Sequence, residues 1–265
     1  MLHSVSAYGQ NEVELGNAQI QHYLPQLLGK KVAVVGNHTS MVGSTKGAVH
    51  LVDTLLASGV DVVHVFAPEH GFRGEAANGA VIQDGLDVAT GLKVFSLHGQ
   101  HKKPTPRQLE GIDAVVVDIQ DVGARFYTYV TSMVLVMEAC AEQGVEMMVL
   151  DRPNPHGHHM QGPMLEEDFK SFVGWIPTPM VHGLTMGELA KMAVAESWVD
   201  IPLGWDVEVV ACVGWHHGQA FELGIRPSPN LPTATSIALY PSLCLFEPTV
   251  VLSLIHISEP TRQSP

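Results

Sequence analysis

Short runs of β-branched apolar residues recur along the chain, separated by segments with helical spacing. Several runs are apolar at every position, as is typical of parallel strands buried on both faces of a sheet. Repeated strand–helix alternation predicts an α/β fold with a doubly wound, mostly parallel sheet and right-handed crossovers. The predicted strands are residues 31–35, 60–66, 92–96, 114–119, 146–150 and 207–212, and the predicted helices are residues 47–58, 105–109, 124–143 and 185–196.

Prolines interrupt this alternation between residues 152 and 183. Because proline ends helices and central strands, this segment is predicted to be a long ordered loop. Loops of such length inside a compact domain are commonly functional or disordered. The helix that follows has a capping-box sequence, Thr185 with Glu188 three residues later. A second proline cluster, residues 227–232, is expected to open a different structural region.

Composition excludes several classes of protein. Of the 265 residues 46% are hydrophobic, which excludes a globally disordered chain. The net charge of −13 and the lack of any basic run exclude a nucleic-acid partner, which needs a basic face. No apolar stretch of about 18 residues is present, so we predict no membrane span.

Polar, chemically capable residues follow five of the predicted strands. Since the carboxyl ends of parallel strands share the sheet edge where α/β proteins bind ligands, these clusters are expected to converge on one pocket. Loops after strands are polar in any case, so ordinary turn chemistry is the alternative interpretation. The clusters are residues 37–39, 68–74, 97–99, 118–127 and 151–155.

Carboxylates, arginines, histidines and tyrosines together suit acid–base chemistry on a polar substrate. Glycoside cleavage needs one carboxylic acid to protonate the leaving oxygen and a second group opposite it. Glu69, flanked by Pro68 and Phe72, is the first choice for the acid, because apolar surroundings favour a protonated carboxyl group. Alternatively, Glu69 simply pairs with Arg73.

Two aspartates three residues apart, Asp118 and Asp121, are candidates for the second catalytic group, although Asp121 could equally cap the following helix. Arg125 and Arg152 are bidentate donors suited to a substrate carboxylate. Either arginine could instead hold Asp118 or Asp151 in place.

Other motifs predict little additional chemistry. Tyr127 could stack on a sugar ring or fill the core, and His182 either reaches the pocket or stabilises its loop. The histidines at 156–159 and 216–217 lack a spaced carboxylate or cysteine partner, so no metal is expected. The chain has no C-x-x-C, no P-loop and no G-x-G-x-x-G, and we predict no cofactor.

Seven ordered motifs carry a resemblance to a known family. They are Asn-His-Thr at 37–39, Ala-Pro-Glu-His-Gly-Phe-Arg-Gly at 67–74, Asp-Ile-Gln-Asp-Val-Gly-Ala-Arg-Phe-Tyr-Thr-Tyr at 118–129, Asp-Arg-Pro-Asn-Pro at 151–155, His-Gly-Leu-Thr at 182–185, Pro-Ser-Pro-Asn-Leu-Pro at 227–232 and Tyr-Pro-Ser-Leu-Cys-Leu-Phe-Glu at 240–247. Over about residues 20–247 the chain resembles the exo-acting β-N-acetylmuramidases of bacterial peptidoglycan turnover, formerly a domain of unknown function.

The resemblance implies a Rossmann-like catalytic domain, a smaller C-terminal domain and a site between them. It also implies release of terminal N-acetylmuramic acid from the non-reducing end of peptidoglycan fragments. A non-catalytic domain that binds amino sugars is the alternative. By this resemblance Glu69 is the acid, assisted by an aspartate among Asp118, Asp121 and Asp151, and one of Arg73, Arg125 or Arg152 binds the lactyl carboxylate. The expected substrate-binding residues are Asn37, His38, His70, Arg73, Arg125, Tyr127, Asp151, Arg152, Asn154 and His182.

The ends of the chain depart from the family pattern. We expect a lead-in at 1–25, the catalytic domain at 26–225, and the start of a truncated C-terminal region at 226–252. Pro248 stands where family members continue with Gly-Thr, and residues 253–265 resemble a translated sequencing adapter, so we expect a non-native tail there. Residues 1–10 lack a signal-peptide pattern, whereas the family implies a periplasmic or cell-envelope location.

Overall fold

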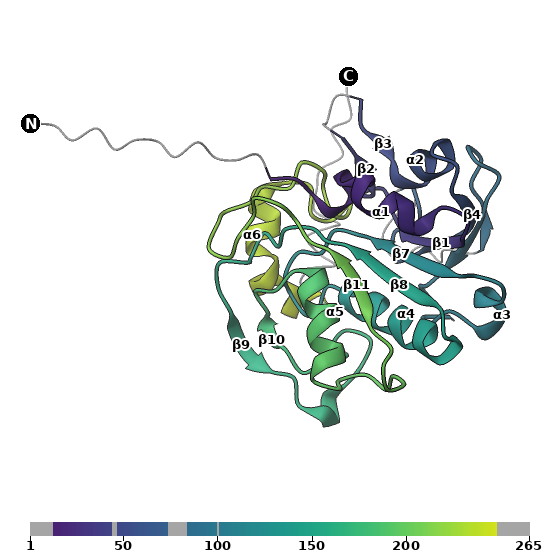
Figure 1. Ribbon diagram of the computed structural model, residues 1–265. Coiled ribbons are helices and arrows are strands. Elements are labelled where there is room, and N and C mark those ends of the chain that lie inside the picture. Colours follow the sequence, from purple (N-terminus) through teal and green to yellow (C-terminus); the bar gives the residue numbers. More distant parts are fainter. Residues whose placement is uncertain (1–12, 44–46, 74–83, 100, 248–265) are drawn as a thin grey trace, which may run out of the picture.

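A seven-stranded sheet forms the centre of the computed structural model, which describes residues 13–43, 47–73, 84–99 and 101–247 (Figure 1). The strand order is β11-β8-β7-β1-β4-β6-β5, and every neighbouring pair is parallel except β5 with β6. The predicted mostly parallel α/β sheet is therefore confirmed. Its strands are β1 (Lys31–Gly36), β4 (Asp61–Ala67), β5 (Gly85–Leu86), β6 (Lys93–Ser96), β7 (Ala114–Asp118), β8 (Glu146–Leu150) and β11 (Val207–Val210).

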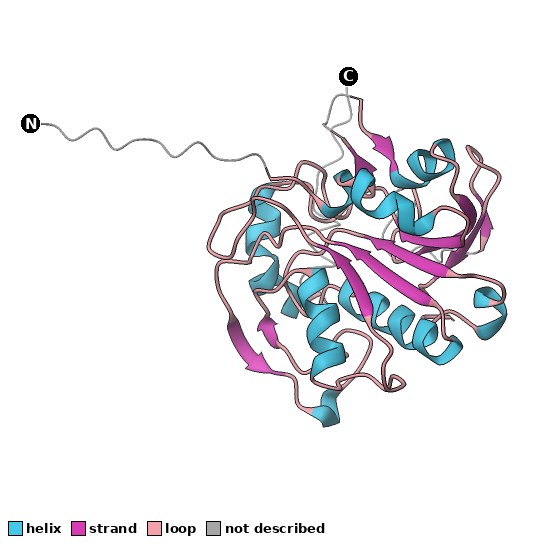
Figure 2. Cartoon of the chain, in the orientation of Figure 1, coloured by secondary structure: helices cyan, strands magenta, loops and turns pink. Residues whose placement is uncertain are grey.

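Helices cover both faces of this sheet (Figure 2). One hydrophobic cluster joins one face to α3, α4, α5 and α6, and a second joins the opposite face to α1 and α2. The helices are α1 (Ile20–Leu27), α2 (Leu51–Ala57), α3 (Pro106–Leu109), α4 (Tyr129–Gln143), α5 (Met186–Ala195) and α6 (Ala234–Leu243). No helix in the described ranges is both long and apolar enough to cross a bilayer.

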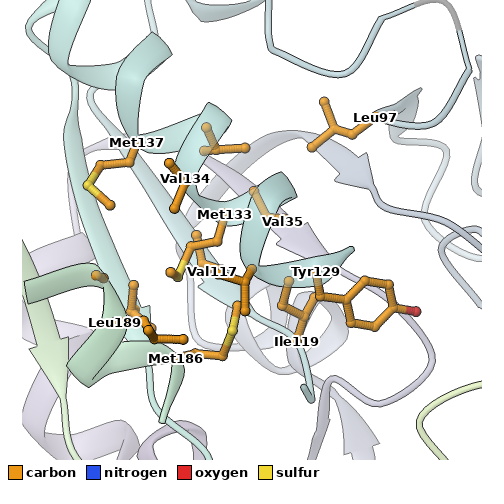
Figure 3. Close-up of a cluster of buried hydrophobic side chains, with 14 of the residues drawn as sticks. Val35, Leu97, Val117, Ile119, Tyr129, Met133, Val134, Met137, Met186 and Leu189 are labelled. Carbon is orange, nitrogen blue, oxygen red and sulfur yellow. The ribbon is translucent and has the colours of Figure 1, made fainter. Parts of the chain in front are cut away.

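The larger cluster is built from the apolar positions that define the strands and helices (Figure 3). Burying each large aliphatic side chain stabilises the fold by about 1.5–3 kcal/mol. The cluster therefore holds the strands in place, and with them the carboxyl ends at the sheet edge. The ring of Tyr129 belongs to the cluster, and its hydroxyl points away from it. Buried members from strands and helices include Val35, Val117, Met133, Val134, Met137, Met186 and Leu189.

Local sequence sets where α5 begins, and a long-range contact sets where α4 begins. Thr185 and Glu188 form the predicted capping box at the start of α5. The predicted helix at 124–143 begins instead at Tyr129, because the residues before it join a neighbouring hairpin. The Arg125 amide donates to the Met180 carbonyl at 2.8 Å, and Ala124 bridges to Val181. Backbone groups used in this way cannot close helical turns.

Short elements occupy the segments between the main strands. The predicted proline-rich loop contains a hairpin of β9 (Gln161–Met164) and β10 (Pro179–Val181) and a 3₁₀ turn (Glu167–Phe169). Prolines are compatible with this two-stranded sheet because both of its strands are edge strands, whose outer sides form no ladder hydrogen bonds. A second small hairpin joins β2 (Met41–Val42) and β3 (Val49–His50).

Both ends of the described chain pack onto the sheet. A 3₁₀ turn (Gly16–Ala18) approaches the sheet so closely that a Cβ on Gly16 would lie 2.3 Å from the Val210 carbonyl oxygen. At the other end Ile237 and Tyr240 of α6 join the larger cluster, followed by a 3₁₀ turn (Cys244–Phe246). Residues 1–12 and 248–265, which include the expected non-native tail, lie outside the described residues.

Candidate active site

The carboxyl ends of β1, β4, β7 and β8 lie at one edge of the sheet, as the sequence predicted. The strand order reverses between β1 and β7, and α/β proteins bind ligands at such a switch point. Asn37, Asp118 and Asp151 follow three of these strands and are buried, whereas Glu69 is only half-buried. Glu69 is thus the most accessible of these four groups.

Glu69 lines a cavity of about 570 Å³, here called the Glu69 pocket, whose volume is typical of small-molecule sites. The Thr128 hydroxyl donates to Glu69 Oε2 at 3.3 Å, and the Tyr129 hydroxyl donates to the Glu69 carbonyl at 3.2 Å. No residue in the described ranges hydrogen-bonds to Oε1. One carboxylate oxygen therefore remains available to a ligand.

A tight turn presents Glu69 to the pocket. The Gly71 amide donates to the Pro68 carbonyl at 3.2 Å, and His70 adopts a left-handed φ of 73°. Such a conformation is uncommon for a residue with a Cβ and stores strain. Burial lowers the pKa of His70, against the opposing effect of the Glu69 charge. His70 also lines the pocket, and its lowered pKa favours the neutral imidazole.

Three tyrosine rings form one wall of the Glu69 pocket. The ring of Tyr127 lies edge-on to Tyr129, with centroids 4.6 Å apart, and to Tyr240, at 5.7 Å. The Tyr127 hydroxyl donates to the Pro227 carbonyl at 3.0 Å, and the Asn37 amide donates to the Tyr129 hydroxyl at the same distance. These bonds fix the rings, which are 7, 1 and 8% exposed for Tyr127, Tyr129 and Tyr240 and so shape the pocket wall as part of the core.

A second carboxylate, Glu247, lines the Glu69 pocket from the 3₁₀ turn after α6. Its side chain is exposed at the pocket mouth. Partial burial and then the negative charge of Glu69 raise the pKa of Glu247. The pocket thus brings together two carboxyl groups, Glu69 and Glu247, which is the pair of groups that acid–base cleavage of a glycoside uses.

Asp118 lies beneath the sheet edge and is fully buried. Arg152 Nε donates to Asp118 Oδ1 at 2.6 Å, and the Asn17 amide donates to Oδ2 at 3.0 Å. Both carboxylate oxygens are therefore occupied within the protein. This geometry favours a positioning role for Asp118, and it matches the alternative in which Arg152 holds that aspartate.

Asp121 and His182 form another buried pair. Asp121 Oδ2 accepts from the Gly123 amide at 2.6 Å and lies 3.5 Å from His182 Nε2. The Leu184 amide donates to His182 Nδ1 at 3.2 Å, which assigns the ring proton to Nε2. Asp121 does not cap α4, because that helix begins eight positions later with no side-chain cap. The Asn154 side chain packs against Gly123, next to Asp121. A Cβ at Gly123 would lie 2.1 Å from Asn154 Oδ1, so only glycine fits there.

Asp151 acts as a buried anchor for α5. Its carboxylate accepts from the Thr185 hydroxyl at 2.7 Å and from the amides of Gly187 at 2.8 Å and Arg152 at 2.9 Å. Burial nevertheless outweighs these bonds and raises the pKa of Asp151 to about 6. The folded protein thus holds this proton more tightly than the unfolded chain does.

A pH-dependent stability follows from Asp151. A raised folded-state pKa contributes stability that is complete below the unfolded value near 4 and is lost as pH rises through about 6. A shift of about two units corresponds to about 3 kcal/mol. We expect the unfolding free energy of wild type, measured by urea titration relative to Asp151→Asn, to fall by this order between pH 4 and 7. A difference that is constant or rises with pH would contradict the assignment.

Three other predicted substrate-binding residues are engaged in structural contacts. Arg73 donates to both oxygens of Asp53, at 3.1 and 3.0 Å, and of Asp87, at 2.7 and 2.8 Å, so the alternative pairing with Glu69 is wrong. Arg125 donates to the carbonyls of residues 163 and 178 and so supports the β9–β10 hairpin. His38 Nε2 contacts the carbonyl of residue 226 at 2.9 Å.

The structure therefore brings Glu69, His70 and Tyr127 together around one pocket, and Arg152 lines a second cavity at the same edge. The other predicted residues lie beneath or beside these cavities. Sequence reasoning missed Glu247 as a site residue, although it ends the last motif of the resemblance. Within the described ranges no group of three or more His, Cys, Asp or Glu side chains could hold a metal ion.

Known proteins are similar to this chain in sequence and in fold. The family described as "Exo-beta-N-acetylmuramidase NamZ, N-terminal" matches residues 32–235. The peptidoglycan β-N-acetylmuramidase NamZ of Bacillus subtilis is 42% identical over 233 residues, which cover 86% of this chain and 55% of that protein. The chain thus spans little more than half the length of this curated relative.

Two crystal structures of DUF1343 family proteins from Bacteroides fragilis have the same fold. The first matches with a TM-score of 0.79 and 45% sequence identity, and the match covers 89% of this chain and 62% of the Bacteroides fragilis chain. The other has a TM-score of 0.80 and 35% identity, with coverages of 88% and 60%. Together with the family match over most of the sheet and its ligand edge, these similarities show that the chain belongs to the NamZ N-terminal family of exo-β-N-acetylmuramidases.

Proposed function

We propose that this chain carries the catalytic part of a glycoside hydrolase that releases terminal N-acetylmuramic acid from the non-reducing end of peptidoglycan fragments. The observation that supports it most directly is a half-buried glutamate, with one free carboxylate oxygen, facing an aromatic-walled cavity. The Bacillus subtilis relative, a peptidoglycan β-N-acetylmuramidase, supports the same substrate class.

In this proposal Glu69 is the general acid. Thr128 holds Oε2, so Oε1 is free to carry the proton to the glycosidic oxygen as the bond breaks. The Tyr129 contact to the Glu69 backbone fixes the turn relative to the core, which keeps the acid within reach of that oxygen. The tyrosine wall shapes the cavity that receives the sugar ring.

The second group at the reaction centre is Glu247 in this proposal. It is the other carboxylate of the Glu69 pocket, and it is exposed to solvent from which a water molecule can be drawn. Asp118 and Asp121, the aspartates predicted from sequence, act by positioning Arg152 and His182. Acid–base catalysis on a glycoside requires a pair of carboxyl groups on opposite sides of the bond.

Substitution Glu247→Gln tests this second role. We expect kcat for a chromogenic N-acetylmuramide to fall about 10²-fold or more, because the variant can neither activate water nor stabilise the oxocarbenium-like centre. The substrate KM should change much less, since the amide keeps the shape of the pocket mouth. The rate measurement needs a matched variant at an exposed carboxylate away from both cavities, for which Glu196→Gln serves. Equal loss in both would remove Glu247 from catalysis.

A non-catalytic domain that binds amino sugars is the competing function. The hydrolase and the binding domain can be distinguished by incubating the chain with the chromogenic N-acetylmuramide. Both release of the chromophore and binding of the intact substrate are measured. The hydrolase proposal predicts release by wild type and binding without release by Glu69→Gln. Binding without release by both would favour the competing function.

A further inference from the structure

A second cavity of about 570 Å³ lies at the same sheet edge, here called the Arg152 pocket. One short segment of the chain, residues 226–227, lies between the residues that line this pocket and those that line the Glu69 pocket. Residues 221–225 line the Arg152 pocket and residues 228–231 contribute to the Glu69 pocket. The residues between them are held down by His38, at the carbonyl of Arg226, and by Tyr127, at the carbonyl of Pro227.

The floor of the Arg152 pocket is polar and unsatisfied. Arg152 is only 5% exposed, and with Nε used by Asp118 its Nη2 has no hydrogen-bond partner among the described residues. Asn17 is fully buried, and its Oδ1 likewise has none there. Buried polar atoms of this kind are costly unless a ligand or water satisfies them.

Gln120 adds a second acceptor to this floor. Its amide nitrogen donates to the carbonyls of Asp121 at 2.8 Å and Pro153 at 2.9 Å, which uses both hydrogens. Only its carboxamide oxygen retains capacity. The pocket thus offers a guanidinium donor beside two amide acceptors, and its walls are apolar at Met41 and Leu223.

The charges around the pocket disfavour an anionic occupant. Arg152 is already neutralised by Asp118, and the exposed carboxylates Glu14 and Glu222 also line the cavity. A free carboxylate or phosphate would enter a field that is negative on balance. A neutral group that accepts one hydrogen bond and donates another meets no such repulsion.

We infer that the Arg152 pocket binds a secondary amide of the substrate, with the amide carbonyl on Arg152 and the amide N–H on Asn17 or Gln120. This inference rests on the proposed function for its substrate class. The terminal muramic acid of a peptidoglycan fragment offers two such amides, its acetamido group and the amide that joins a stem peptide to its lactyl group. Both have an apolar substituent suited to the walls.

Binding to the unmodified chain, measured by isothermal titration calorimetry, distinguishes the two sources. The probes are muramic acid, N-acetylmuramic acid and N-acetylmuramoyl-L-alanyl-D-isoglutamine, none of which carries a glycosidic bond to cleave. If the stem peptide supplies the amide, the last probe binds most tightly, by about 10-fold. If the acetamido group supplies it, N-acetylation alone gives that gain.

Two variants test the pocket itself. Arg152→Lys keeps the charge beside Asp118 but loses the Nη donors, and Ala18→Phe fills the cavity from its wall. Each is expected to abolish the amide-dependent gain, whereas Ala195→Phe, at an exposed position on α5, keeps it. Thermal melts establish that each variant is folded.

Equal affinity of wild type, Arg152→Lys and Ala18→Phe for all three probes would overturn the inference, as would no gain from either amide. A different result would overturn the proposed hydrolysis, namely turnover by Glu69→Gln equal to that of wild type. The binding measurements do not depend on the rate of turnover.

Discussion

Replacement of Glu69 by Gln is expected to lower kcat by about 10²–10⁴-fold, the usual contribution of a general acid, for a chromogenic N-acetylmuramide whose leaving phenol is weakly acidic and therefore needs a proton. The amide keeps the size of the side chain and can still accept from Thr128, so the pocket and its affinity should persist. The loss should therefore fall on kcat, with KM nearly unchanged. Steady-state release of the chromophore gives both constants.

The matched control is Glu166→Gln, at an exposed glutamate before the 3₁₀ turn of the proline-rich segment. Its rate should equal that of wild type. With a second substrate whose leaving group needs no protonation, Glu69→Gln should lower kcat much less. This comparison separates the loss of proton donation from a general distortion of the site. Unchanged turnover of the poor leaving group by Glu69→Gln would remove this residue from the mechanism.

Replacement of Arg152 by Met is expected to lower the unfolding free energy by about 3–5 kcal/mol, because it leaves the Asp118 carboxylate buried and unpaired. The arginine and the aspartate are 5% and 0% exposed, so the carboxylate loses its cationic partner in a poorly hydrated position. Urea titration monitored by circular dichroism measures the change. The corresponding variant of an exposed ion pair, Lys191→Met beside Asp206, should cost less than about 1 kcal/mol.

The double variant Arg152→Met with Asp118→Asn completes a cycle. Removing both charges should recover a large part of the loss, since two neutral groups of similar shape carry no ionic desolvation penalty. Additive losses in the double variant would show that the two side chains act independently. That outcome would also weaken the assignment of Asp118 as the residue that positions Arg152.

The fold could be predicted because its signals are local. Apolar runs such as β1 and β7 are buried along almost their whole length, and the capping box at Thr185 starts a helix as expected. The start of α4 could not be predicted, because Arg125 is drawn out of the helix by a contact to residue 180. A distant partner there outweighed local helix propensity.

The candidate site was predictable in place but not in detail. Parallel strands guarantee that Glu69, Asp118 and Asp151 share an edge. Which of them faces a cavity depends on partners far away in sequence, such as Asn17, 101 residues before the aspartate it contacts. The predicted acid faces a pocket, whereas the aspartates are bonded within the protein. Glu247 was missed because no local pattern distinguishes it from a surface carboxylate.

Tyr129 joins the interior of the domain to its reactive edge. Its ring is packed in the larger cluster, while its hydroxyl holds both the Glu69 backbone and Asn37. Together with Thr128 at the start of α4, this side chain would transmit a shift of the helix to Glu69. A substitution in the hydrophobic interior near Tyr129 can consequently alter the geometry at Glu69 without touching the pocket itself.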